Sequence, residues 1–160
     1  MTEIRFESNE AVLGRTVVAR LKRDTDLVSG IIEVCRANGL EMASVDVAIG
    51  SLRSATMCWV VPENNKRGAR RSDPVRIEGP LEFIVGQGLV CLTGDKPLVH
   101  FHGTVTDPSG KSWSGHIFPG GNPVHVTADI VIHELKGVTM KTIYEEELDV
   151  DVVVTAPAEG

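Results

Sequence analysis

The segment that decides the fold reads LEFIVGQGLVCL (81–92), TGDK (93–96), PLVHFHGTVT (97–106), DPSGK (107–111) and SWSGHIF (112–118). Its first two apolar runs are joined by Gly94-Asp95, which predicts a β-hairpin with a tight turn. The five residues 107–111 combine Asp, Pro, Ser and Gly and predict a second turn. The segment therefore predicts three consecutive antiparallel strands.

Outside this segment the sequence predicts one helix and several more strands. Asp24, Thr25 and Asp26 are N-cap candidates, and the apolar residues that follow recur at helical spacing up to Gly39, which suits a left-handed C-terminal cap. Further strands are expected at 16–21, 44–49, 56–61 and 124–135. One main helix packed on a mainly antiparallel sheet indicates an α+β fold.

Length and composition predict a single globular domain. The 160 residues are 42% hydrophobic and 24% charged. We expect a loose N-terminal arm at 1–15, a folded domain at 16–143 and an acidic, flexible C-terminal tail at 144–160.

The cysteines and the termini predict the compartment. Cys35, Cys58 and Cys91 are odd in number and lack paired spacing, which predicts reduced core residues. The sequence has no apolar run of membrane-spanning length, and its N-terminus does not resemble a signal peptide. We therefore expect a cytoplasmic protein without a membrane partner.

Three of the five histidines lie inside the hairpin segment, within a stretch of seventeen residues. His100 and His102 are two apart on one predicted strand and so face the same side. A five-residue turn at 107–111 places His102 opposite His116, and directly opposed residues share a face with Cβ atoms about 5 Å apart. A turn one residue shorter would send His116 to the other face.

Three converging imidazoles resemble the ligand set of a zinc site with an open position. The sequence therefore predicts a divalent metal, zinc first, held by His100, His102 and His116, with the small residues Gly103 and Gly115 beside them. The alternative is that these are ordinary half-buried strand histidines. Gln87, expected opposite His102, and Glu82 are the candidate catalytic groups.

The order of these motifs resembles the plants-and-prokaryotes conserved (PCC or PPC) domain family. The resemblance covers about residues 16–137, and the motifs that carry it most clearly are Gly79-Pro80-Leu81-Glu82-Phe83-Ile84, Gly88, Lys96 to His102, Asp107 to Gly110 and Gly115-His116. It implies an antiparallel sheet with a packed helix and assembly as a homotrimer.

The resemblance also implies two functions. Plant members accompany AT-hooks in nuclear DNA-binding proteins, and prokaryotic members are often described as DNA-binding. The fold is similar to that of acetolactate decarboxylase, a zinc enzyme whose His-x-His pair and later His match His100, His102 and His116. Its other active-site groups have no clear match here.

A basic cluster at 64–71 is the remaining candidate site. Ala69 separates Gly68 from Arg70 and no Pro follows, so the Arg-Gly-Arg-Pro order of an AT-hook is absent. A net charge of −6 also argues against DNA as a partner. The cluster is either a solvated loop or an anion site, in which a guanidinium binds a substrate carboxylate bidentately. The candidates are Arg67, Arg70, Arg71 and Arg76.

Three functions remain open from the sequence. The first is a metal-dependent lyase or decarboxylase that acts on a small carboxylic acid. The second is a DNA-binding or regulatory protein. The third is a non-catalytic trimer that binds a ligand or serves as a scaffold.

Overall fold

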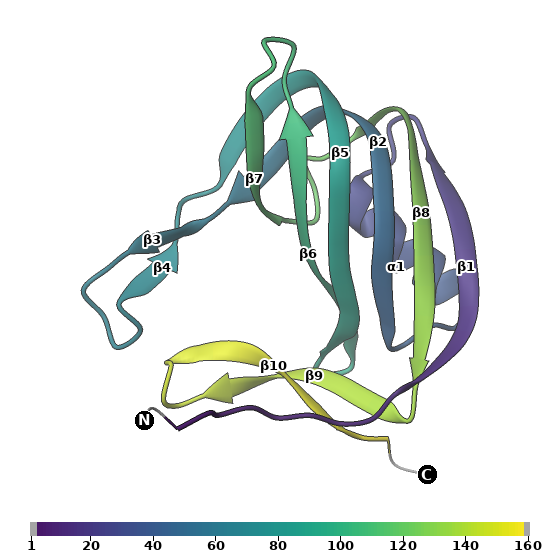
Figure 1. The fold of residues 1–160 in the computed structure, drawn as a ribbon. Coiled ribbons are helices and arrows are strands. Elements are labelled where there is room, and N and C mark those ends of the chain that lie inside the picture. The colour runs from purple at the N-terminus through teal and green to yellow at the C-terminus, as the bar shows by residue number, and fades with distance from the viewer. Residues whose placement is uncertain (1–2, 159–160) are drawn as a thin grey trace.

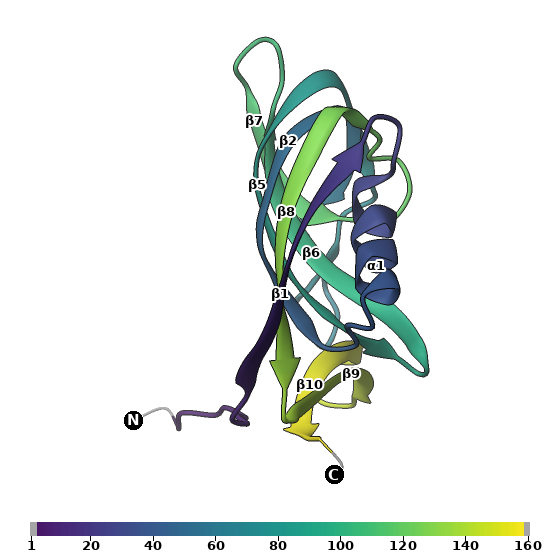
Figure 2. The ribbon, with the colours of Figure 1, turned by 90° about the vertical axis from the view of Figure 1, so that its right-hand side faces the viewer.

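One large β-sheet, a two-stranded arm and one helix make up the structure, a computed structural model that describes residues 3–158 (Figures 1 and 2). The elements in chain order are β1 (Val12–Lys22), α1 (Leu27–Ala37), β2 (Ala43–Cys58), β3 (Val60–Pro62), β4 (Ala69–Arg71), β5 (Val75–Thr93), β6 (Lys96–Thr106), β7 (Ser112–Ile117), β8 (Val124–Lys136), β9 (Val138–Glu145) and β10 (Val150–Pro157). The α+β prediction is confirmed in its coarse form: the sheet is mostly antiparallel and the helix is short.

Strand pairing closes part of the sheet into a circuit. β1, β8, β2, β5 and β6 pair in that order, all antiparallel. β7 pairs with β6 and also with the end of β2, where Cys58 lies opposite His116. The pairings of β2, β5, β6 and β7 therefore return to their starting strand, which brings the chain after Cys58 next to β7.

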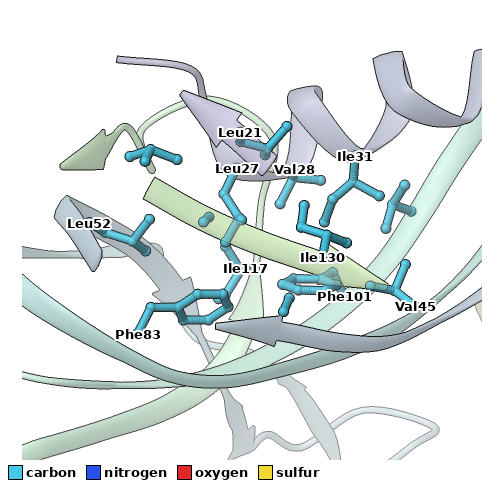
Figure 3. Close-up of a cluster of buried hydrophobic side chains, with 14 of the residues drawn as sticks. Leu21, Leu27, Val28, Ile31, Val45, Leu52, Phe83, Phe101, Ile117 and Ile130 are labelled. Atoms are coloured by element: carbon cyan, nitrogen blue, oxygen red, sulfur yellow. The ribbon is translucent and has the colours of Figure 1, made fainter. Parts of the chain in front are cut away.

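The helix begins where its capping residues predict. The Asp26 side chain accepts a hydrogen bond from the Ser29 backbone N–H at 3.0 Å. Leu27, Val28 and Ile31 are fully buried against the sheet (Figure 3). Within residues 3–158, no helix has the length and apolar character needed to cross a membrane.

The two faces of the sheet have different roles. Along β6, Val99 and Phe101 are buried in the core on the helix side, whereas His100 and His102 alternate to the outer face. A Cβ on Gly86 would lie 2.4 Å from Cζ of Phe101, so glycine at this position leaves room for the aromatic ring. The outer face is thus free to carry a site.

Two segments differ from the sequence prediction. The region 144–160, expected to be a flexible tail, contains β10, which pairs with β9 along its whole length. The reason is the Val-rich run at 150–154, in which Val153 packs against the buried cluster of Met42, Cys91, Val138 and Met140. The acidic residues Glu146 and Glu147 lie in the turn between the two strands. The first strand also begins at Val12, inside the expected arm at 1–15.

The basic loop is also ordered differently from the prediction. β3 and β4 form a short two-stranded arm, with Val60 opposite Arg71. The Asn65 side-chain oxygen accepts hydrogen bonds from the backbone N–H groups of Arg67 and Ala69, which closes the tip of the arm. The three cysteines are unpaired and buried, which confirms their prediction as core residues.

Candidate metal centre

The His100, His102 and His116 rings converge on the outer face of β6 and β7. The predicted register is confirmed, because His102 pairs with His116 across the two strands. Nε2 of His100 lies 3.1 Å from Nε2 of His102, which lies 3.4 Å from Nδ1 of His116. One ligand atom from each ring lies within 4.8 Å of the other two.

These separations fit a single metal ion. Zinc binds imidazole nitrogen at about 2.0–2.1 Å, and tetrahedral angles then place two such nitrogens about 3.3 Å apart. The observed separations of 3.1 and 3.4 Å lie on either side of this value. The three rings could therefore hold one divalent ion and leave a coordination position for a ligand.

The surroundings keep the rings neutral. Burial is the main cause that lowers the pKa of His116 to about 4, and the Arg71 guanidinium lowers it further. Burial also lowers the pKa of His100 and of His102 below the ordinary value. Neutral imidazole is the form that binds a metal, so the triad needs to release no proton near pH 7.

A glycine sets the position of the third histidine. A Cβ on Gly115 would lie 2.4 Å from the backbone oxygen of Cys58, so only glycine allows β7 to approach the end of β2 this closely. The same approach pairs Cys58 with His116. The contact between β2 and β7 therefore fixes the strand that carries the third ligand.

The two candidate catalytic groups lie at different distances from the triad. Gln87 pairs with His102 across β5 and β6, as predicted, and its side chain is exposed on the same face. Glu82 pairs with Thr106, four residues along β6 from His102, or about 13 Å at about 3.3 Å per residue. The structure thus brings Gln87 beside the triad but not Glu82.

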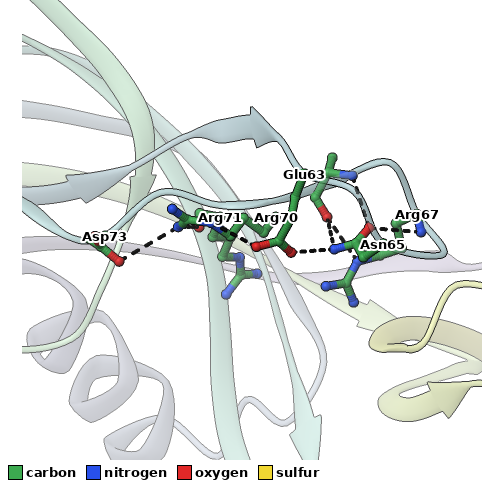
Figure 4. Close-up of polar contacts among 7 residues, drawn as sticks. Glu63, Asn65, Arg67, Arg70, Arg71 and Asp73 are labelled. Carbon is green, nitrogen blue, oxygen red and sulfur yellow. Dashed lines mark hydrogen bonds and ion pairs between the residues drawn. The ribbon is translucent and has the colours of Figure 1, made fainter.

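The four candidate arginines have different surroundings, and Figure 4 shows three of them, Arg67, Arg70 and Arg71. Arg70 pairs with Glu63 at 3.1 Å and with Asp73 at 3.7 Å. Arg67 donates to the backbone oxygens of Ala69 and Asp149. Arg76 pairs with Glu78 at 2.6 Å.

Arg71 lies beside the triad instead. It lines a pocket of about 360 Å³ together with all three histidines. The other residues that line it are Cys58, Trp59, Val60 and Gly115.

The sequence prediction missed the apolar part of the site. The Phe118 ring packs against His116 with centroids 4.8 Å apart, and Trp59 lines the pocket. A second cavity of about 850 Å³ shares Val60, Arg71, His100 and His116 with the first pocket and continues along β10. These residues come from distant segments, so no local spacing could have grouped them.

Two curated proteins match the chain in sequence. The chain is 30% identical over 118 residues to the bifunctional protein GlmU of Synechococcus sp. (strain JA-3-3Ab), a match that covers 74% of this chain and 17% of that protein. A GlmU of a second Synechococcus strain matches in the same way, at 32% identity. The chain thus spans about a sixth of the length of the curated relatives it matches.

Solved structures share the fold. A metal-containing protein from Archaeoglobus fulgidus superimposes with a TM-score of 0.77 at 23% identity, covering 93% of this chain and 99% of that one. A plant- and prokaryote-conserved protein from Pyrococcus horikoshii gives a TM-score of 0.75 at 24% identity, covering 91% and 96%.

The family itself is settled by its own sequence model. The model of the Plants and Prokaryotes Conserved (PCC) domain matches residues 8–136, which is most of the chain and begins earlier than the expected start at 16. The resemblance of the motifs is thereby confirmed, and the chain belongs to the PCC domain family.

Proposed function

We propose that this PCC domain binds one divalent metal ion, with zinc the first candidate, through His100, His102 and His116. The observation that carries the proposal is the spacing of the three ring nitrogens, which matches the spacing of ligands around a single ion. A structural neighbour described as metal-containing supports it.

The proposed role of the metal is that of a Lewis acid toward a small carboxylic acid, as in a lyase or decarboxylase. A divalent ion supplies polarisation of a carbonyl or carboxyl oxygen. Gln87, beside His102, is placed to hydrogen-bond such a ligand through its amide. The position of Glu82 gives it no direct part in this chemistry.

Elemental analysis tests the metal proposal. We expect about one metal ion per chain in protein purified without chelator, and none in His102→Ala. His133→Gln is the matched control, because His133 lies on β8 and contacts Thr16 and Asp46 rather than the triad. Equal metal content in His102→Ala and the unaltered protein would refute the site.

We also propose that the domain forms a homotrimer. Support comes from a row of apolar side chains on the outer sheet face, where Val18, Val131 and Val47 lie opposite one another across β1, β8 and β2. Val18 is 76% exposed, and exposed apolar patches commonly mark interfaces. Light scattering after size exclusion should give about three times the 17.3 kDa chain mass. A monomer mass would contradict the trimer.

DNA binding has less support than metal binding. Arg67 and Arg70 in the basic arm are engaged in internal contacts, and the net charge is −6. We expect no DNA affinity near physiological salt. A salt-dependent affinity that Arg70→Ala weakens would favour the DNA-binding function instead.

A further inference from the structure

Two strand pairings place Arg71 at the metal centre. β2 ends at Cys58, which lies opposite His116. After one intervening residue β3 begins and pairs Val60 with Arg71. Arg71 therefore lines the same pocket as the three histidines. A cation this close to a metal site has no role in holding the metal, because it repels a positive ion.

Arg71 is also available for a ligand. Within residues 3–158, no carboxylate lies within ion-pair distance of its guanidinium, whereas Arg70 and Arg76 are both paired with glutamates. An arginine presents a planar set of donors that matches the two oxygens of a carboxylate. Because the Arg71 guanidinium has no carboxylate partner within residues 3–158, we expect it to bind an anionic ligand.

The larger cavity indicates what the rest of the ligand is. It extends from Arg71 along an apolar wall formed by Leu98, Phe118, Pro119, Val150, Val152 and Val153. Of its other charged lining residues, Arg70 is already paired with Glu63 and Asp73, and Arg67 donates to backbone oxygens. Asp151 also lines the cavity and disfavours a second negative charge. The pocket beside the triad thus suits one carboxylate, and the cavity beyond suits an uncharged apolar tail.

We propose that the site binds a small monocarboxylate with a short apolar tail, in which Arg71 holds the carboxylate next to the metal and the tail lies along β10. The proposal rests on the metal centre proposed above. It assigns Arg71 as a ligand-binding residue and makes the arm of β3 and β4 part of the site.

Calorimetry on the zinc-loaded full chain tests the assignment, with butyrate as the probe and butyramide as its uncharged match. We expect Arg71→Gln to weaken butyrate binding about 10- to 100-fold, the usual effect of losing a charged hydrogen-bonding partner. Arg71→Lys should recover part of the loss, because it keeps the charge but not the paired donors. Butyramide should bind weakly and equally to all variants.

Arg76→Gln is the matched control, since Arg76 pairs with Glu78 and lines neither pocket. It should bind butyrate like the unaltered protein. Formate, which lacks a tail, should bind more weakly than butyrate.

Metal content, measured on every sample, separates the two proposals. Equal butyrate affinity in Arg71→Gln and the unaltered protein, each with one metal per chain, would overturn the role of Arg71 and leave the metal centre standing. Absence of butyrate binding to the zinc-loaded protein would also overturn the role of Arg71. Formate binding as tightly as butyrate would contradict the proposal that the cavity binds an apolar tail. A protein that takes up no metal would refute the proposed metal centre, and with it the proposed carboxylate site.

Discussion

His102 and His116 lie directly across the β6–β7 pair, with 3.4 Å between Nε2 of the first and Nδ1 of the second. The two rings belong to different strands, joined by the turn at 107–111. A metal bound to both would connect the strands only in the folded state. Metal binding should therefore stabilise the fold as well as equip the site.

Zinc should raise the free energy of unfolding by about 2.7 kcal/mol when it is present at about 100 times its dissociation constant. Urea denaturation with and without zinc measures this increment. His116→Ala should lose the increment, because only two ring nitrogens remain. An equal gain in His116→Ala would mean that zinc binds elsewhere.

Gly115→Ala should lower metal affinity and stability together. The added Cβ would lie 2.4 Å from the Cys58 backbone oxygen, so β7 must move away from β2 and carry His116 with it. Zinc titration followed by thermal unfolding measures both effects. Ser114→Ala, whose hydroxyl contacts only the exposed Thr104 hydroxyl in this region, is the control and should bind zinc normally. Normal zinc affinity in Gly115→Ala would show that the strand contact does not position the ligand.

Phe101→Ala should cost about 3–5 kcal/mol of stability, the usual range for deleting a large buried aromatic side chain. Phe101 is fully buried and packs against Phe83 with ring centroids 6.4 Å apart. Chemical denaturation measures the loss, and Phe6→Ala, at a position 79% exposed, should change stability little. A cost below about 1 kcal/mol for Phe101→Ala would contradict the proposed core.

The metal-free protein should lose stability as the pH falls from about 6.5 toward 4. The pKa of His116 is about 4 in the folded chain, mainly because of burial, against an ordinary value of 6.5. Between these values the unfolded chain binds more protons than the folded one, so acid favours unfolding. Denaturation of chelator-treated protein at several pH values measures the slope, which His116→Gln should reduce. An NMR titration of His116 with a midpoint near 6.5 would refute the shift.

The sequence predicted those features that depend on neighbouring residues. The register of His102 with His116 follows from the length of one turn, and the helix start follows from the cap at Asp26. Arg71 could not be separated from the other arginines in this way. Its place depends on the pairing of Cys58 with His116, a contact between distant segments.

The C-terminal hairpin was missed for a related reason. Glu145, Glu146 and Glu147 gave the segment the charge of a solvated tail, although Glu145 ends β9 and the other two lie in the turn between β9 and β10. What holds β10 is Val153 against a buried cluster that includes Met140 and Cys91. The acidic composition of the turn thus led to the prediction of a solvated tail, although the strands on either side of the turn are paired and packed.

The alternation of side chains along β6 has a consequence for how this domain can change over generations. Val99 and Phe101 maintain the core from one face, while His100 and His102 project from the other. Selection can therefore replace the outward residues without first compensating for a damaged interior. The fold can therefore be conserved while the outward-facing residues, at every second position of the same strand, change and alter the chemistry of the site.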